Sequence, residues 1–474
     1  MVDPMRDRRT LVSRAARAIT PRRRERGRAG PRLRDYGTSM FVALFLLNLV
    51  DEFDRAVLAV ALDDIRREFE LSDATVALLP VAFIFTAGIV VVPAAVWADR
   101  WIRTFILAIG AAVWSVAGLA AAAAQSFGQL FATRIFLGFG QGTAAPTHLS
   151  LLSDSYPVSV RGRALAWNLA ANPLGLAVGA VIGSAMIATV GWRWTFAAAA
   201  LPGLALALVV LRLREPQRGE ADLKAAVDEN PFLTEFLREP DGNETFREAV
   251  GAIARQATLR RLIIANAALG FSLFGSVFWF PTLFERLYGF DTDTAGLVIA
   301  LVGAAAFLGT WFGGPLADRN LLRGFPYLAT FAARCIAVTA VSWPLAFLSP
   351  WPVVTLPLLA LGAGVASLGA GGLMSIVAAC ALPKRRSQVF AAYGLALTVC
   401  GAALAPIVIG VGSELLQSAG ESPAHALHWS VFASTASVIS IGVWMVHRSR
   451  RSCAEDANQT ITEFLMSLTQ EPTP

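Results

Sequence analysis

Apolar stretches of about 20 residues recur along almost the whole chain, and they constrain its fold more than any other feature. Each stretch is long enough to cross a hydrocarbon layer of about 30 Å as a helix. An open sheet cannot satisfy its backbone in lipid, and a spanning barrel would show short alternating segments instead. Only 16% of the residues are charged, against about 25% in soluble domains. The sequence therefore predicts an all-α, polytopic membrane protein.

Twelve spans are predicted, six on each side of a polar stretch. The first six are expected at residues 38–62, 76–98, 104–124, 128–152, 164–188 and 194–213. The second six are expected at residues 259–283, 295–317, 326–348, 353–382, 389–416 and 426–447. The predicted segments are a basic tail at 1–37, a six-helix bundle at 38–213, a central loop at 214–258, a second bundle at 259–447 and a tail at 448–474. Within the central loop, a short amphipathic helix is expected near residues 231–254.

The distribution of charge orients these spans. Arginine clusters occupy every second predicted loop and both tails, whereas the intervening loops hold acids with few positive charges. By the positive-inside rule, both termini are expected to face the cytoplasm, and the net charge of +6 reflects topology rather than nucleic-acid binding. The Ala- and Arg-rich, Lys-poor composition favours a bacterial cytoplasmic membrane. The four cysteines form no CxxC pair, so we expect neither a disulfide nor a metal site.

Two predicted loops at equivalent places in the two halves carry the same short motif. Residues 95–103 read AVWADRWIR after the second span, and residues 314–319 read GPLADR after the eighth. Both resemble the signature loop of the major facilitator superfamily, Gly-x-Leu-Ala-Asp-Arg-x-Gly-Arg, although the first copy has Ala95 and Ile102 in place of the two glycines. The resemblance implies two pseudo-symmetric six-helix bundles that rock about a central cavity to give alternating access.

The same resemblance implies a gate. Asp99 would face the start of the eleventh span near Ser387 and Gln388, and Asp318 would face the start of the fifth span near Gly162. A carboxylate is favoured there by the helix dipole and the free N–H groups. In a simpler interpretation, the two aspartates only cap helices and set topology. The predicted gating residues are Asp99, Arg100, Arg103, Arg161, Arg163, Asp318 and Arg319.

Further motifs along the chain are similar to those of the spinster-like lysolipid transporters and the neighbouring anion:cation symporters. They include residues 134–140, which read RIFLGFG, and residues 192–194, which read WRW. This resemblance implies proton coupling. Two positions depart from the family pattern: Gln141 stands where a glutamate is usual, and residues 400–403 read CGAA where an aspartate is common. Two protonatable groups of the family are therefore absent from this sequence.

Charged residues within predicted spans are the candidate coupling site, because such residues are costly in lipid and usually functional. The first span holds Asp51, Glu52, Asp54 and Arg55, and the fourth holds Arg134. A carboxylate that pairs with an arginine can release it on protonation, which would couple protons to transport. Two alternatives remain: a static charge cluster near the outer interface, or direct binding of an anionic substrate by the forked guanidinium groups.

Other residues are candidates for the wall of the substrate cavity. Phe274 and Phe278 lie on one helix stripe beside Trp279, and this stripe faces either lipid or an amphiphilic substrate. Asn168 and Asn172 share a face of the fifth span and can supply polar contacts, as can Gln141.

These observations predict a secondary active transporter of an organic solute, amphiphilic or anionic, and not an enzyme. We expect proton coupling, with an uncoupled facilitator or a drug-type exporter as alternatives, and a ligand receptor without transport as a more distant one. No P-loop, zinc signature or nucleophile elbow stands in a supporting context, so no cofactor is expected. The expected partners are a small organic substrate, protons and membrane lipids, with no nucleic acid, and the chain is expected to act as a monomer.

Overall fold

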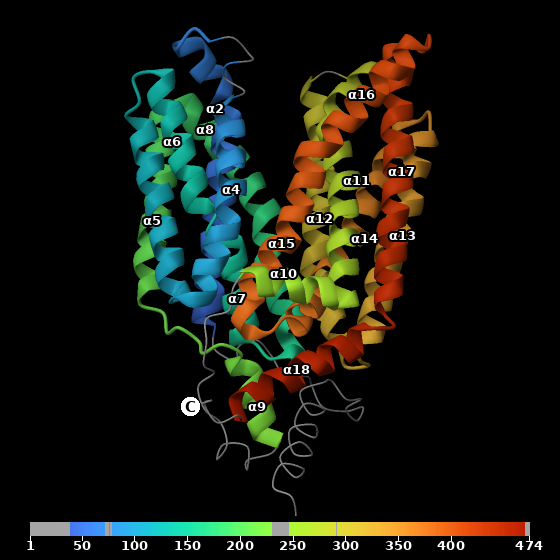
Figure 1. Ribbon diagram of the computed structural model, residues 1–474. Coiled ribbons are helices and arrows are strands. Elements are labelled where there is room, and N and C mark those ends of the chain that lie inside the picture. Colours follow the sequence, from blue (N-terminus) through green and yellow to red (C-terminus); the bar gives the residue numbers. More distant parts are fainter. Residues whose placement is uncertain (1–37, 72–74, 76–77, 230–245, 291, 470–474) are drawn as a thin grey trace, which may run out of the picture.

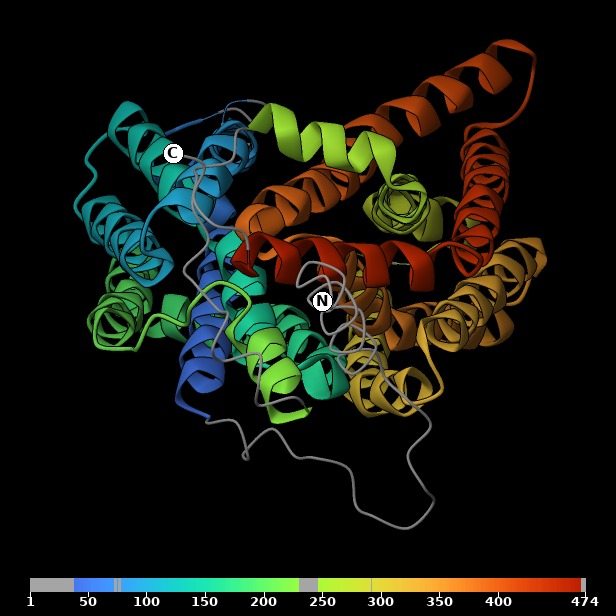
Figure 2. The same ribbon diagram turned by 60° about the horizontal axis from the view of Figure 1, so that its bottom comes forward.

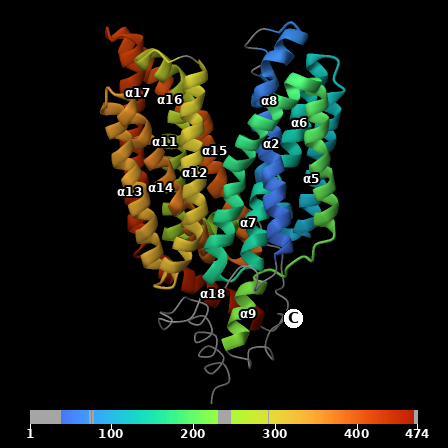
Figure 3. The same cartoon turned by 180° about the vertical axis from the view of Figure 1, so that it is seen from behind.

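The computed structural model describes residues 38–71, 75, 78–229, 246–290 and 292–469. Within this part of the chain the regular structure is helical throughout and contains no strand. The helices form two groups that meet at one end and diverge toward the other (Figures 1 and 3). We call these the joined end and the separated end. The predicted all-α fold is confirmed.

The N-terminal bundle contains six helical elements. They are α2 (Ser39–Glu68), α4 (Leu78–Arg100), α5 (Arg103–Ala122), α6 (Phe127–Gln141), α7 (Ala144–Ser155) and α8 (Val158–Leu211). The fourth predicted span is not continuous, because it breaks between α6 and α7 at Gly142 and Thr143. The Thr143 hydroxyl donates to the Gly140 carbonyl over 2.8 Å, which satisfies a backbone group near the break.

The element α8 holds two predicted spans in one run of 54 residues. The two halves meet at Gly191, whose φ of 80° and ψ of 164° are open to glycine because it has no Cβ. Both ends of α8 lie at the joined end, so the chain reverses direction at Gly191. The fifth span was expected to begin at residue 164, but α8 begins at Val158. The signature-loop contacts described below therefore fall on its second turn.

The C-terminal bundle contains the other spans. Its elements are α11 (Ala257–Tyr288), α12 (Thr292–Leu321), α13 (Phe325–Leu348), α14 (Pro352–Cys380), η3 (Pro383–Arg385), α15 (Arg386–Thr398), η4 (Val399–Leu404), α16 (Ala405–Ser418) and α17 (Pro423–Ser449). The eleventh predicted span corresponds to α15, η4 and α16, and η4 is a π-helical insertion within it. A Cβ at Gly401 would lie 2.7 Å from the Gly270 carbonyl oxygen, so η4 needs a glycine where it passes α11.

Three helices lie outside the spans at or near the joined end (Figure 1). They are α9 (Glu220–Glu229), α10 (Phe246–Arg255) and α18 (Cys453–Thr469). The amphipathic helix expected near residues 231–254 overlaps α10, and its first part lies outside the described residues. Most of the predicted tail, residues 448–474, forms α18, because the buried side chains of Cys453, Ile461, Phe464 and Leu465 pack on the bundles.

The membrane-spanning elements account for twelve spans. Among the described residues, nine helical runs are long and apolar enough to cross a membrane. One of these runs is α8, which crosses twice. Two further spans fall outside these nine runs. The first is α2, which carries several charged residues, and the second is formed by α6 and α7, which are separated by a break. The prediction of twelve transmembrane helices is confirmed.

Candidate functional site

The two bundles are locked together at the joined end by Asp99, the last residue but one of α4. Its carboxylate accepts hydrogen bonds from the backbone N–H groups of Ser387 and Gln388 over 3.1 and 3.0 Å. These groups belong to the first turn of α15, which has no side-chain cap of its own. Asp99 thus caps a helix of the opposite bundle, and all three residues are buried.

The corresponding residue of the second half, Asp318 of α12, makes a different contact. It accepts from the backbone N–H of Arg163 over 3.2 Å and pairs with the Nε of the same residue at 3.0 Å. A Cβ at Gly162 would lie 3.0 Å from the Asp318 carboxylate, and a Cβ at Gly314 would lie 2.9 Å from the Cα of Arg163. The small residues of the motif therefore permit the close approach of α12 to α8.

Two tryptophans extend this contact between α8 and α12. The rings of Trp167 and Trp311 stack with their centroids 5.0 Å apart, and the Trp167 indole donates to the Trp311 carbonyl over 2.9 Å. The Arg163 guanidinium lies 5.9 Å from the centre of the Trp167 ring. The seam at α8 and α12 is thus closed by an ion pair and aromatic rings, whereas the seam at α4 and α15 is closed by a helix cap.

A buried charge network fills the space between these two seams. Arg103 of α5 donates to Asp154 of α7, and Arg386 of α15 donates to the second oxygen of the same carboxylate. Arg103 also pairs with Glu215 at 2.8 Å. The side chains of Arg103, Asp154 and Arg386 are almost fully buried. Asp154 therefore joins the two bundles through a pair of arginines.

The central loop contributes a second bridging carboxylate, Asp222 of α9. One of its oxygens accepts from Arg161 of α8 over 2.6 Å, and the other accepts from Arg386 over 3.1 Å. Arg218, in the turn before α9, lies 3.8 Å from the Asp99 carboxylate. Burial and the neighbouring Arg103 guanidinium hold the pKa of Arg218 below its ordinary value, although Asp99 acts in the opposite direction.

A second charge cluster lies on α2, about 24 Å along the helix axis from its start at Ser39. Arg55 pairs with Asp51 at 3.0 Å and with Glu52 at 2.9 Å. Its Nε donates to the Gln141 side chain of α6 over 3.3 Å. The Arg55 side chain is 37% exposed, whereas its carboxylate partners are buried. Arg55 thus has three polar partners, and its side chain remains partly exposed.

Arg134 of α6 is held much less firmly. Its side chain is 1% exposed, and its ion pair with Asp54 spans 3.9 Å. Its guanidinium lies 4.7 Å from the centre of the Phe196 ring. The Nε and one terminal nitrogen of Arg134, and one oxygen of Asp54, have no hydrogen-bond partner in the protein. Two buried donors are therefore available to a ligand or to water.

The predicted cavity residues fall into two groups. Asn48 donates to the Asn172 side chain and to the Asn168 backbone carbonyl, the latter over 2.9 Å, which makes an amide cluster between α2 and α8. Phe274 and Phe278 are 53% and 62% exposed, so their stripe points away from the packed core of the bundle. The Trp279 indole instead donates to the Pro406 carbonyl over 3.2 Å.

The structure brings together only part of the predicted gate. Arg100 and Arg319 are exposed and lie outside the contacts described above. Asp154, Asp222 and Arg386 were missed. Asp154 could have been identified from the sequence, because an acid near the end of an apolar stretch is costly in lipid and usually functional. Arg386 follows Lys384 and Arg385, and a basic run of this kind is indistinguishable from a topology signal. Among the described residues, no three His, Cys, Asp or Glu side chains gather as a metal site.

Sequence comparison decides the family. The model of the Major Facilitator Superfamily matches residues 44–406. The chain belongs to this superfamily. The superfamily and the curated relatives are transporters and not enzymes, and two of these relatives are named for the transport of L-galactonate and of anions. The major facilitator fold also explains why the two signature loops occupy equivalent places in the two bundles.

Curated relatives place this major facilitator transporter near the spinster-like branch. A probable L-galactonate transporter of Escherichia coli is 26% identical over 283 residues, which are 58% of this chain and 61% of the relative. Protein spinster of Drosophila melanogaster is 27% identical over 40% of this chain and 32% of the relative. Protein spinster homolog 3 of Danio rerio is 25% identical over 79% of this chain and 76% of the relative. The first two matches thus span about three fifths and about one third of the relatives' length.

Solved structures show the same fold. An inward-facing bacterial homolog of the human lysosomal transporter Spinster has 21% identity and a TM-score of 0.51, with 92% of this chain and 99% of that chain covered. A proton:xylose symporter has 17% identity and a TM-score of 0.65 over 86% and 95% of the two chains. A human organic anion transporter has 15% identity and a TM-score of 0.64 over 86% and 99%.

Proposed function

We propose that this protein moves a small organic anion across the membrane together with protons, by alternating access between its two bundles. The observation that carries the proposal is the charge cluster of α2 and α6. It contains three buried carboxylates, Asp51, Glu52 and Asp54, and two guanidinium groups, Arg55 and Arg134. Three negative and two positive charges leave one net negative charge when every group is ionised.

This excess of carboxylates opposes the binding of an anion. Arg55 is already paired with two carboxylates at about 3 Å, and a substrate carboxylate or phosphate must compete with them. Protonation of one carboxylate would remove a negative charge and free guanidinium donors for the substrate. The anion and the proton would therefore enter together, which is symport. Arg134 supports the same interpretation, because two of its buried nitrogens have no partner in the protein.

Alternating access is supported by the distribution of contacts. Asp99, Asp318, Asp154 and the tryptophan pair connect the bundles at the joined end, and the bundles diverge toward the separated end (Figure 1). The TM-score against the inward-facing homolog, 0.51, is lower than that against the xylose symporter, 0.65, although its sequence identity is higher. A different tilt between the two bundles in this structure and in the inward-facing homolog would lower that TM-score.

Orientation follows from the charges. The joined end carries the basic loops that contain Arg100, Arg161 and Lys384, so we assign it to the cytoplasm of a bacterial inner membrane. The structure would then be the state that opens outward. Relatives named for L-galactonate and ascorbate transport favour a small hydrophilic acid as the substrate. The amide cluster of Asn48, Asn168 and Asn172 offers donors and acceptors for the hydroxyl groups of such an acid.

The test is proton uptake by the purified protein in liposomes, with a panel of sugar acids, lysolipids and cationic drugs. We expect an acid of the panel to evoke proton uptake, and Asp54→Asn to reduce the uptake at least about 10-fold. Asp64→Asn is the matched control, because Asp64 lies on the same helix outside the cluster. Substrate flux without proton movement would replace symport by uncoupled diffusion, with the amide of Gln141 as the reason. Binding without flux would refute transport.

A further inference from the structure

We propose that the joined end carries a third closure outside the membrane, a lid in which the C-terminal helix α18 holds the central-loop helix α9 so that Asp222 bridges Arg161 and Arg386. The lid rests on the proposed function, because it acts only if the bundles separate at this end. Its role is to stabilise the outward-opening state. Asp222 is a positioning residue that acts through the two arginines.

The segment that leads into α9 is attached to the N-terminal bundle. Glu215 accepts from the backbone N–H of Thr104 over 3.0 Å and pairs with Arg103. The Pro216 carbonyl accepts from Arg103 over 2.8 Å. Arg218 donates to the carbonyl of Ala98 over 2.9 Å. Residues 215–218 therefore follow α4 and α5 when the bundles move.

The helix α18 is attached to the C-terminal bundle. Its Asp456 accepts from the backbone N–H of Thr258, at the start of α11, over 2.9 Å. Its Thr460 donates to the carbonyl of Cys380, at the end of α14, over 3.1 Å. Ser452, directly before α18, bonds with the Thr258 hydroxyl at 2.7 Å. From these anchors α18 crosses the joined end toward the N-terminal bundle (Figure 2).

The two attached segments meet at Gly219 and Phe464. Gly219 has a φ of 72°, and a Cβ there would lie 2.6 Å from the Phe464 ring. Phe464 is 3% exposed, so its ring covers the turn before α9. Thr460, Ile461 and Phe464 of α18 line the same small hollow as Arg161, Asp222 and Arg386. The end of α18 therefore seals the arginine–aspartate bridge from water, which strengthens it.

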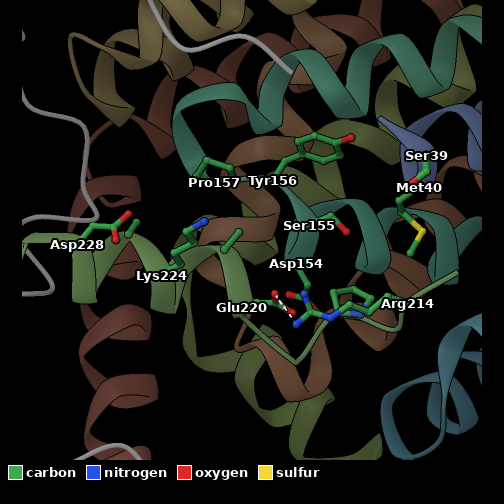
Figure 4. A pocket seen from close by; sticks show the side chains of 13 residues that line it. Ser39, Met40, Asp154, Ser155, Tyr156, Pro157, Arg214, Glu220, Lys224 and Asp228 are labelled. Carbon is green, nitrogen blue, oxygen red and sulfur yellow. Dashed lines mark ion pairs between the residues drawn. The ribbon is translucent and has the colours of Figure 1, made fainter. Parts of the chain in front are cut away.

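One face of α9 packs on the core through Leu223, Ala226 and Val227, and another face is open. A cavity of about 360 Å³ separates it from the ends of α2 and α7, and Glu220, Lys224 and Asp228 border this cavity (Figure 4). Lys224 and Asp228 are exposed. Because one face of α9 borders a cavity, the helix depends for its position on its packed face, on its first turn and on α18.

Separation of the bundles would break the bridge at Asp222. Arg161 belongs to α8 of the N-terminal bundle, and Arg386 belongs to α15 of the C-terminal bundle. One carboxylate can follow only one of these arginines. Loss of the bridge leaves a buried guanidinium without one of its partners, which is unfavourable. The lid therefore shifts the resting equilibrium toward the state in which the joined end is closed.

The experiment measures the ratio of the two states in the full-length protein in nanodiscs. Spin labels are placed at the separated end by Gln125→Cys and Glu421→Cys, both exposed, in a Cys400→Ser background, because the other three cysteines are buried. Opening of the joined end would shorten the label distance. The test variants are Asp222→Asn and Phe464→Ala. Their matched controls are Asp228→Asn on α9 and Glu463→Gln on α18, both exposed.

We expect each test variant to raise the short-distance to long-distance ratio about fivefold or more, with both controls unchanged. Phe464→Ala decides the question if Asp222→Asn fails to fold, because Phe464 lies outside the spans. If neither test variant moves the ratio while Asp318→Asn does, the lid is refuted and alternating access stands. If Asp318→Asn also leaves the ratio unchanged, both the lid and the alternating access of the proposed function are refuted.

Discussion

Asp99 and Asp318 occupy the same place in the two halves of the chain and close the joined end in different ways. Asp99 crosses to the opposite bundle and bonds to two backbone N–H groups at the start of α15. Asp318 crosses to α8 and reaches its second turn, at Arg163, because this helix begins at Val158. It therefore meets a charged side chain instead of a free helix end.

The difference shows that one repeated motif can make two kinds of contact between the bundles, which we call locks. The Asp99 lock is a buried helix cap, in which neutral groups and the helix dipole stabilise the carboxylate. The Asp318 lock is an ion pair with Arg163, whose side chain is 22% exposed, and it is backed by the stacked pair of Trp167 and Trp311. Buried caps resist salt, whereas partly exposed ion pairs weaken in it. The two locks can therefore be separated by experiment.

The largest effect is expected for Asp99→Ala. This change removes two hydrogen bonds to a buried carboxylate and leaves α15 without a cap, at a cost of about 2 kcal/mol to the closed joined end. The ratio of short to long distances between labels at residues 125 and 421 should rise about 30-fold. Arg100→Gln, at an exposed neighbouring position, is the control. An effect smaller than that of Asp318→Asn would reverse the ranking of the two locks.

A smaller effect is expected for Asp318→Asn. The amide can still accept the backbone N–H of Arg163, so the loss is the ion pair alone, about 1 kcal/mol, or a fivefold change in the ratio.

Salt separates this lock from the first. Raising the ionic strength from about 0.1 M to about 1 M shortens the Debye length from about 10 to about 3 Å. Higher salt should weaken the Arg163–Asp318 ion pair and raise the ratio. This rise should remain in Asp99→Ala, which keeps the ion pair, and should be smaller in Asp318→Asn, which lacks it. Equal salt dependence in both variants would contradict the assignment of the two locks.

The smallest effect is expected for Trp167→Leu. Leucine keeps an apolar side chain but removes the ring stack and the indole hydrogen bond to Trp311, which together contribute about 0.7 kcal/mol. The ratio should rise about threefold. Trp101→Leu is the control, because the Trp101 ring is 65% exposed and stands apart from the stack. Tryptophan fluorescence of the unlabelled protein should also change when the joined end opens, and a change that Trp167→Leu leaves unaffected would exclude the stack as its source.

The signature motif located Asp99 and Asp318, whereas their partners at residues 387, 388 and 163 lie outside the motif and were approached only through the family resemblance. The start of α8 was expected six residues later, because residues 158–163 include polar side chains typical of a loop and become helical where they are buried against neighbouring helices. The break at Gly142 was missed for a related reason. A single glycine within an apolar run carries no sign of whether the helix continues.

The charge clusters show a similar limit. The spacing of Asp51 and Arg55 on one helix predicted their pairing, because residues four apart share a face. The joining of Asp154, Asp222 and Arg386 depends on three elements that are distant in sequence, and no local pattern encodes it. The helix α18 was missed because a short amphipathic segment acquires its partner only from the folded bundles.

Gly191 has a consequence for how the protein is made. The chain reverses at this single residue, so the two spans of α8 follow each other without a loop between them. They can therefore form one helical hairpin whose turn depends on Gly191. A side chain at this position would oppose the positive φ during biogenesis, before any contact between the bundles exists. The cost of such a change would therefore appear in the yield of inserted protein, and not in the behaviour of the molecules that mature.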